Sequence, residues 1–157
     1  MQYFNASIPN GIYQIEISQD KVIKVFCDFD IENKFAWTLV ESFSHYFASS
    51  LYSLSFNLGI NARDPSQRNN VYRLPFKQMD QIQSVSTHNL VTCNFDLSMN
   101  RDYLLLDNNK DGWNILTKTK SICRPITEVN VRGYQCNDGT APFWTLSNHF
   151  HLDSSYK

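Results

Sequence analysis

The sequence predicts an α+β fold, in which a twisted antiparallel sheet carries one or two short helices and long loops and is stapled by disulfides. Aromatic residues make up 14% of the 157 residues, and aromatic side chains favour half-buried, pleated surfaces. Several runs alternate apolar and polar residues, as strands do. Long runs of Ala, Leu, Glu and Lys are missing, which argues against long helices.

The composition predicts one globular domain over residues 1–157. The chain is 42% hydrophobic and 18% charged, which excludes an intrinsically disordered chain. A formal net charge of −1 disfavours nucleic acid as the main partner. No apolar stretch approaches the roughly 20 residues that a membrane helix needs. Residues 1–9 also lack the basic start and apolar centre of a signal peptide.

The first half of the chain predicts a β-hairpin followed by a third strand. The strands are expected at residues 12–17, 22–29 and 36–43. The polar residues 18–20 separate the first two strands and predict the hairpin turn. Residues 44–70 show no sustained period, and within them residues 63–70 are typical of an exposed loop.

The second half of the chain predicts a short helix and further strands. Pro75 suits the first position of a helix, and apolar residues recur at helical spacing over residues 75–84. Strands are expected at residues 89–95, 128–134 and 143–152. The short apolar patch at residues 102–106 fits either a strand or another conformation.

Four cysteines fit two disulfides, for which three pairings exist. Cys123 and Cys136 would close a small loop, which leaves Cys27 and Cys93 to pair with each other or to stay free. In a reducing compartment all four would be thiols. The even count and the secreted-looking composition favour disulfides and an extracellular location.

Three segments resemble the start of fibrinogen C-terminal-like (fibrinogen-related) domains. They are NGIY at residues 10–13, IKVFCDF at 23–29 and AWTLV at 36–40. The family has a G-x-Y strand, a C-D strand and a G-W-T strand in this order and at about this separation. The chain is therefore identified as a divergent, shortened relative, with the resemblance confined to residues 10–43 and to the spacing of Cys123 and Cys136.

The resemblance implies a disulfide between Cys123 and Cys136, close to a calcium site and an acetylated-sugar site. The family's first cysteine, upstream of the G-x-Y strand, is missing here, so Cys93 becomes the candidate partner of Cys27. In the family a pair of aromatic residues lies beside the last disulfide. Here Phe143 and Trp144 follow the second cysteine, and they are the candidate ligand-binding residues.

A calcium site is the first candidate for bound chemistry. Residues 107–112 read DNNKDG, the first half of an EF-hand-type loop, with candidate ligands Asp107, Asn109 and Asp111. The twelfth loop position is Lys118 rather than Glu, so the closing bidentate ligand is missing. The alternative is an ordinary polar turn.

A metal-dependent hydrolase is the alternative to a binding module. His149, His151 and Asp153 alternate, so on a strand they would share one face. Two histidines and a carboxylate can bind zinc and leave a position for an activated water. The alternative is the solvent-facing side of an ordinary strand. Because the chain has no nucleophile elbow or phosphate loop, we expect no enzymatic activity.

Four aromatic residues in the irregular segment are the remaining binding feature. Tyr46, Phe47, Tyr52 and Phe56 either stack on a ligand or cover the core beneath a long loop, and the second is the commoner arrangement. The sequence as a whole favours a secreted, non-enzymatic recognition or adhesion module. Its partner would be a glycan or an extracellular protein, with calcium as the expected cofactor. A structural component of the extracellular matrix is a further alternative, and an oligomer is compatible with the sequence.

Overall fold

The structure is a computed structural model that describes residues 8–30, 35–52, 54–93, 102–110, 114–116, 123–131, 133–145 and 150–152. The chain divides into two compact units, Met1–Ile82 (unit 1) and Gln83–Lys157 (unit 2). The strand pairs are antiparallel. The predicted α+β class is confirmed in its coarser form, since antiparallel sheets combine with short helices and long loops. Within the described residues, no helix has the length and apolar character to span a membrane.

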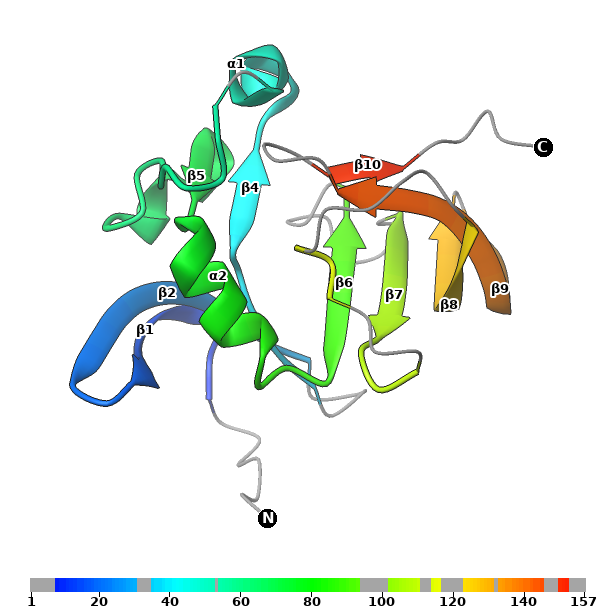
Figure 1. Cartoon of the computed structure of the whole chain (residues 1–157), viewed down its shortest axis with the longest axis horizontal. Helices are drawn as coiled ribbons and strands as arrows, with labels where there is room; N and C mark the ends of the chain where they lie inside the picture. Colours follow the sequence, from blue (N-terminus) through cyan, green and yellow to red (C-terminus); the bar gives the residue numbers. More distant parts are fainter. Residues whose placement is uncertain are drawn as a thin grey trace. The chain divides into compact units, whose positions relative to one another are not determined.

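Unit 1 begins with a three-stranded sheet in the order β1-β2-β3. Its strands are β1 (Gly11–Ser18), β2 (Lys21–Asp30) and β3 (Phe35–Thr38). The predicted hairpin is confirmed, and Figure 1 shows it in blue. Asp20 in its turn has a φ of 60°, a left-handed conformation that Asp tolerates because its side chain bonds to nearby backbone.

The single strand predicted for residues 36–43 is wrong, because the chain changes pairing partner in the middle. β3 pairs with β2, whereas β4 (Glu41–Phe43) pairs with β5 (Val71–Arg73) in a separate two-stranded sheet. The break is visible in two backbone hydrogen bonds. The Leu39 N–H donates to the Phe26 carbonyl, whereas the Val40 carbonyl accepts from the Leu74 N–H.

Short helical segments occupy the part of unit 1 that was expected to be irregular. They are the 3₁₀ helix η1 (His45–Phe47), α1 (Ala48–Tyr52) and the 3₁₀ helix η2 (Pro65–Asn69). The predicted loop at 63–70 is thus partly helical, because the Asp64 side chain caps η2 by accepting from the Ser66 N–H. The helix predicted after Pro75 is confirmed as α2 (Phe76–Gln83).

A buried arginine organises the core of unit 1. Arg73 is 0% exposed, and its Nη2 lies 3.1, 2.9 and 3.3 Å from the carbonyl oxygens of Leu54, Ser55 and Leu58. Its guanidinium also lies 5.2 Å from the centre of the Phe56 ring. A buried charge is tolerated when hydrogen bonds replace its water shell. The folding of residues 54–58 around Arg73 supplies those bonds.

Glu41 faces Arg73 across the β4–β5 pair but does not form a tight ion pair with it. The two residues are opposite each other in the register, and Arg73 Nη1 lies 3.9 Å from Glu41 Oε1. Burial raises the pKa of Glu41 to about 7, and the attraction of Arg73 offsets only part of this rise. Desolvation prevails because Nη2 of Arg73 is directed to backbone carbonyls.

Unit 2 is a five-stranded antiparallel sheet in the order β10-β9-β8-β7-β6. Its strands are β6 (His88–Thr92), β7 (Tyr103–Asp107), β8 (Cys123–Val131), β9 (Tyr134–Thr145) and β10 (Phe150–Leu152). Figure 1 shows β9 as a long, curved strand. The core of unit 2 contains Leu104, Leu106, Ile115, Leu116 and Ile126, all of which are buried.

Two strand predictions in unit 2 are wrong in their limits. The strand expected at 128–134 begins at Cys123, and its end turns at Gly133, which has a φ of 83°. The strand expected at 143–152 consists of the end of β9 and all of β10, which pair with each other. Apolar and aromatic residues continue through both, so the alternation alone gave no sign of the reversal.

The expected disulfides are not present, and all four cysteines are free thiols. Along the β8–β9 pair, Cys123 lies opposite Pro142 and Cys136 lies opposite Val129. The two cysteines are therefore separated by the stretch of β8 from 123 to 129, which is about 20 Å at a strand's usual rise. A disulfide needs Cα atoms about 4.4–6.8 Å apart. The predicted bond between Cys123 and Cys136 thus conflicts with the register, and the extracellular location that depended on it loses this support.

We expect a thiol titration without reductant to find four free thiols in denaturant and three fast-reacting thiols in the folded protein. Cys93, Cys123 and Cys136 are exposed, whereas Cys27 is buried. Burial raises the pKa of the Cys27 thiol, and the thiolate is the reactive form. Alkylation followed by mass spectrometry identifies the slow thiol. Fewer than four thiols in denaturant would show that a disulfide forms after all.

Candidate functional site

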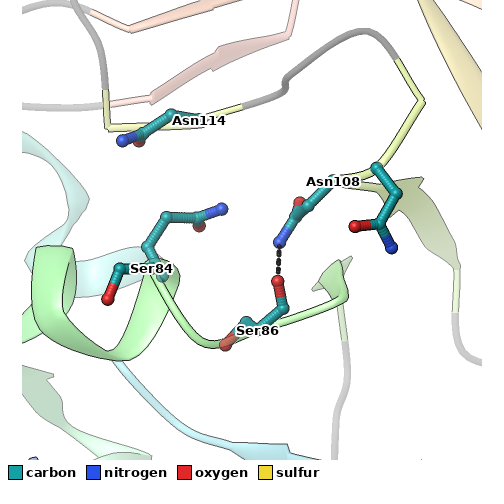
Figure 2. A pocket seen from close by; sticks show the side chains of 6 residues that line it. Ser84, Ser86, Asn108 and Asn114 are labelled. Atoms are coloured by element: carbon teal, nitrogen blue, oxygen red, sulfur yellow. Dashed lines mark hydrogen bonds between the residues drawn. The ribbon is translucent and has the colours of Figure 1, made fainter.

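A polar cavity of about 240 Å³ lies in unit 2, beside the end of β7. Its lining residues are amides and hydroxyls, namely Gln83, Ser84, Ser86, Asn108, Asn109 and Asn114. Figure 2 shows the side chains of Ser84, Ser86, Asn108 and Asn114 arranged around it. The cavity therefore combines the turn after α2 with the turn after β7.

Asn108 holds these two turns together. Its backbone N–H donates to the Thr87 carbonyl at 2.9 Å, and its side-chain Nδ2 donates to the Ser86 carbonyl at 2.8 Å (Figure 2). Its Oδ1 accepts from Nδ2 of Asn89. An asparagine side chain can donate and accept at once, so one residue fixes the wall of the cavity.

Asn114 forms the opposite side of the lining and is held by a local turn. Its Oδ1 accepts from the Leu116 N–H at 2.8 Å. Ile115 and Leu116 are buried in the core of unit 2, which anchors this short segment. The side-chain oxygen of Asn114 is thus committed to the backbone, and its NH₂ group supplies the donors that a ligand could use.

The segment predicted to bind calcium forms a polar turn where the structure describes it. Oδ1 of Asp107 accepts from the Asn109 N–H at 2.8 Å. This hydrogen bond, with smaller effects of His88 and Lys110, lowers the pKa of Asp107. Asp111 lies outside the described residues, within which no group of three or more potential metal ligands occurs. Calcium binding by Asp107, Asn109 and Asp111 stays a prediction.

The lining of the cavity suits hydrogen bonding to a neutral ligand. None of the described lining residues has an ionisable side chain, so these residues offer neither a general acid nor a general base. Amides and hydroxyls both donate and accept, which matches the hydroxyl groups of a sugar. The described lining therefore suits hydrogen bonding to a polyhydroxylated molecule.

The other predicted site residues lie in β9 and β10 or outside the described residues. Phe143 and Trp144 lie in β9, opposite Leu152 and His151 of β10. Of the proposed zinc ligands, only His151 falls in a described strand, and His149 and Asp153 lie outside the described residues.

The aromatic residues of the irregular segment in unit 1 have different environments. Phe56 is 3% exposed and lies beneath Arg73, as a core residue would. Tyr46 is 84% exposed and contacts Phe47 edge to face, with ring centres 5.2 Å apart. The prediction that these aromatics cover the core is confirmed for Phe56 and wrong for Tyr46. Of Tyr52, the structure describes only the backbone in α1.

Most residues of the cavity were missed by sequence reasoning. Asn109 was named as a calcium ligand, whereas Gln83, Ser84, Ser86 and Asn114 were not singled out. Asn, Ser and Gln are also the ordinary residues of turns, so their presence in two separate segments gave no signal. The two turns come together through the β6–β7 pairing, in which His88 lies opposite Asp107, and through the hydrogen bonds of Asn108.

Comparisons of the chain with protein-family models, curated proteins and solved structures found no match. The resemblance to fibrinogen-related domains stays a prediction.

Proposed function

We propose that this protein is a non-enzymatic recognition module and that the cavity beside Asn108 binds a neutral carbohydrate. The observation that supports the proposal is the lining itself, which contains three asparagines, a glutamine and two serines. Sugar hydroxyls need partners that both donate and accept, and amides and hydroxyls meet that need. Binding of a protein partner through the same turns is the broader form of this proposal.

Hydrogen bonds and buried neighbours hold the described walls of the cavity in place. The Asn108 side chain ties the Ser86 carbonyl to the end of β7, and the buried residues after Asn114 fix the other side. Loops held on a sheet are where binding residues usually lie. A pre-organised site loses less conformational entropy when a ligand binds.

The proposal requires neither disulfides nor calcium. The lining residues lie in unit 2 and are positioned by backbone pairing and amide hydrogen bonds. Secretion and membership of the fibrinogen-related family are therefore separate proposals. A thermal melt with added calcium or with chelator tests the cation by itself, and a shift that disappears on replacing Asp107 and Asp111 by Ala would favour the calcium site.

Screening the whole chain against a glycan array identifies the saccharide, and substitution then tests the cavity. We expect Asn109→Ala to weaken the best neutral ligand about 5- to 10-fold, because one hydrogen bond is lost. The Asn109 side chain lines the cavity, and only its backbone N–H serves the turn, so folding should be preserved. Isothermal titration calorimetry measures the change.

Asn137→Ala is the matched control for this experiment. Asn137 is exposed on β9 and is not part of the cavity lining. Equal losses in the two variants, or an array on which no neutral saccharide binds, would contradict the carbohydrate proposal. Recovery of a cleaved saccharide would contradict the non-enzymatic part and favour a hydrolase.

A further inference from the structure

Unit 1 contains a second and larger cleft, of about 710 Å³, in which three cationic side chains meet. The residues that line it are Lys21, Val22, Ile23, Lys24, Gly59, Ala62, Arg63, Pro75 and Gln78. No carboxylate is among these lining residues. From this geometry we propose that the cleft binds a small ligand that carries at least two oxyanion groups, each a phosphate or a sulfate group.

The position of the cleft along β2 explains why both Lys21 and Lys24 line it, although they lie on opposite faces of the strand. Side chains at positions 21 and 24 of a strand point to opposite faces, so a site on one face could use only one of them. β3 pairs with β2 only over Cys27–Asp30. The stretch from Lys21 to Lys24 therefore lies beyond the end of β3, where side chains from both faces can reach around the strand's edge.

The rest of the lining comes from the loop before η2, from Pro75 and from the beginning of α2. A Cβ atom built on Gly59 would lie only 2.9 Å from both Ala62 Cβ and Pro75 Cδ. The close approach at Gly59 thus packs the loop against the start of α2 and fixes this part of the lining. The loop also contributes Arg63 to the lining, so the cations come from both β2 and this loop.

The three cations form no close ion pair in the part of the molecule that is described. None of Lys21, Lys24 and Arg63 forms an ion pair there, unlike Arg73, which is buried beside Glu41. Hydrogen bonds from Ser66 and Gln67 are the main cause of the lowered pKa of Asp64, and the attraction of Lys24 adds only weakly to it. The Asp64 carboxylate accepts hydrogen bonds from Ser66 and Gln67 and so is held at the start of η2. A bound anion would relieve the repulsion among the three cations.

The chemistry of the lining defines the ligand class. Arg and Lys bind phosphate and sulfate oxygens through charge-assisted hydrogen bonds. Val22, Ile23, Ala62 and Pro75 add an apolar surface against which a sugar ring or another carbon framework can pack. The volume lies within the range of small-molecule sites. The proposal does not depend on the proposed function, because every lining residue belongs to unit 1.

Calorimetric titration of the whole chain with two probes, pyrophosphate and a disulfated disaccharide, tests the site. We expect at least one probe to bind and its affinity to fall as salt is added. Lys24→Gln and Arg63→Gln should each weaken it about 5- to 10-fold, and the double variant should weaken it more than either single change. Binding of pyrophosphate alone would assign phosphate, and binding of the disaccharide alone would assign a sulfated sugar.

Two further variants make the test specific. Lys77→Gln removes a cation from the exposed side of α2 outside the cleft, and we expect no more than a twofold change. Asp64→Asn keeps a residue that can cap η2 but removes the negative charge, so affinity should rise about twofold. The proposal is wrong if neither probe binds, or if the cleft variants lose no more affinity than Lys77→Gln.

Discussion

Replacing Arg73 by Met should lower the free energy of unfolding by about 3–5 kcal/mol, because several buried polar groups lose their partner at once. The substitution removes the donor that Leu54, Ser55 and Leu58 share. It also leaves the buried carboxylate of Glu41 without its nearest cation. Urea unfolding followed by circular dichroism measures the loss.

Arg63→Met is the matched control for this loss, because Arg63 is an exposed arginine of the same unit. Exposed substitutions usually change stability by less than about 0.5 kcal/mol. A loss at Arg73 no larger than that at Arg63 would contradict the role given to Arg73 in ordering residues 54–58. Arg73→Lys separates charge from shape. A lysine keeps the charge but cannot reproduce the planar fork of donors, so it should recover only part of the loss.

Glu41 should make the protein less stable as the pH rises from about 4.5 to about 7. Its pKa is about 7 in the folded chain against an ordinary value of 4.5. Between these values the folded state binds more protons than the unfolded state, so the free energy of unfolding falls with rising pH. The full difference corresponds to about 3 kcal/mol, and this stability is present below pH 4.5 and lost by about pH 7.

Glu41→Gln isolates this effect, because the amide cannot ionise. We expect the variant and the original chain to be similarly stable near pH 4.5 and the variant to be the more stable one above pH 7. Glu16→Gln, an exposed change on β1, controls for the general charge effect. Thermal melts across this pH range measure the difference. If Glu41→Gln is instead the less stable chain above pH 7, the ion pair with Arg73 outweighs desolvation.

The sequence spacing of the cysteines allowed a disulfide that the strand register excludes. The count and the spacing of Cys123 and Cys136 were compatible with a closed loop, because spacing says only how much chain lies between two residues. The β8–β9 pairing places Cys123 and Cys136 on neighbouring strands, but at positions that are far apart along those strands. A hairpin holds a cystine only where the two cysteines are near neighbours across the strands.

The candidate site was predictable only in fragments. Residues 107–112 were recognised as rich in oxygen donors, and Asn109 does line a cavity. Asp107, however, directs its carboxylate to the turn. The remaining lining residues are Gln83 at the end of α2, the two serines of the turn after it, and Asn114. Serine and asparagine are ordinary turn residues, so they gave no signal of a site. The same holds for the cationic cleft, since Lys24 and Arg63 are far apart in sequence and show no shared pattern.

The sequence alone determined the antiparallel α+β character, the β1–β2 hairpin and the helix after Pro75. These features depend on alternation and turn chemistry within a few residues, and such signals can be read locally. Only the tertiary structure decided the break between β3 and β4, the reversal between β9 and β10, the burial of Arg73 and the separation of the cysteines. Each of these depends on which distant strand supplies the hydrogen-bond partners, and that choice is made by the packing of the whole unit.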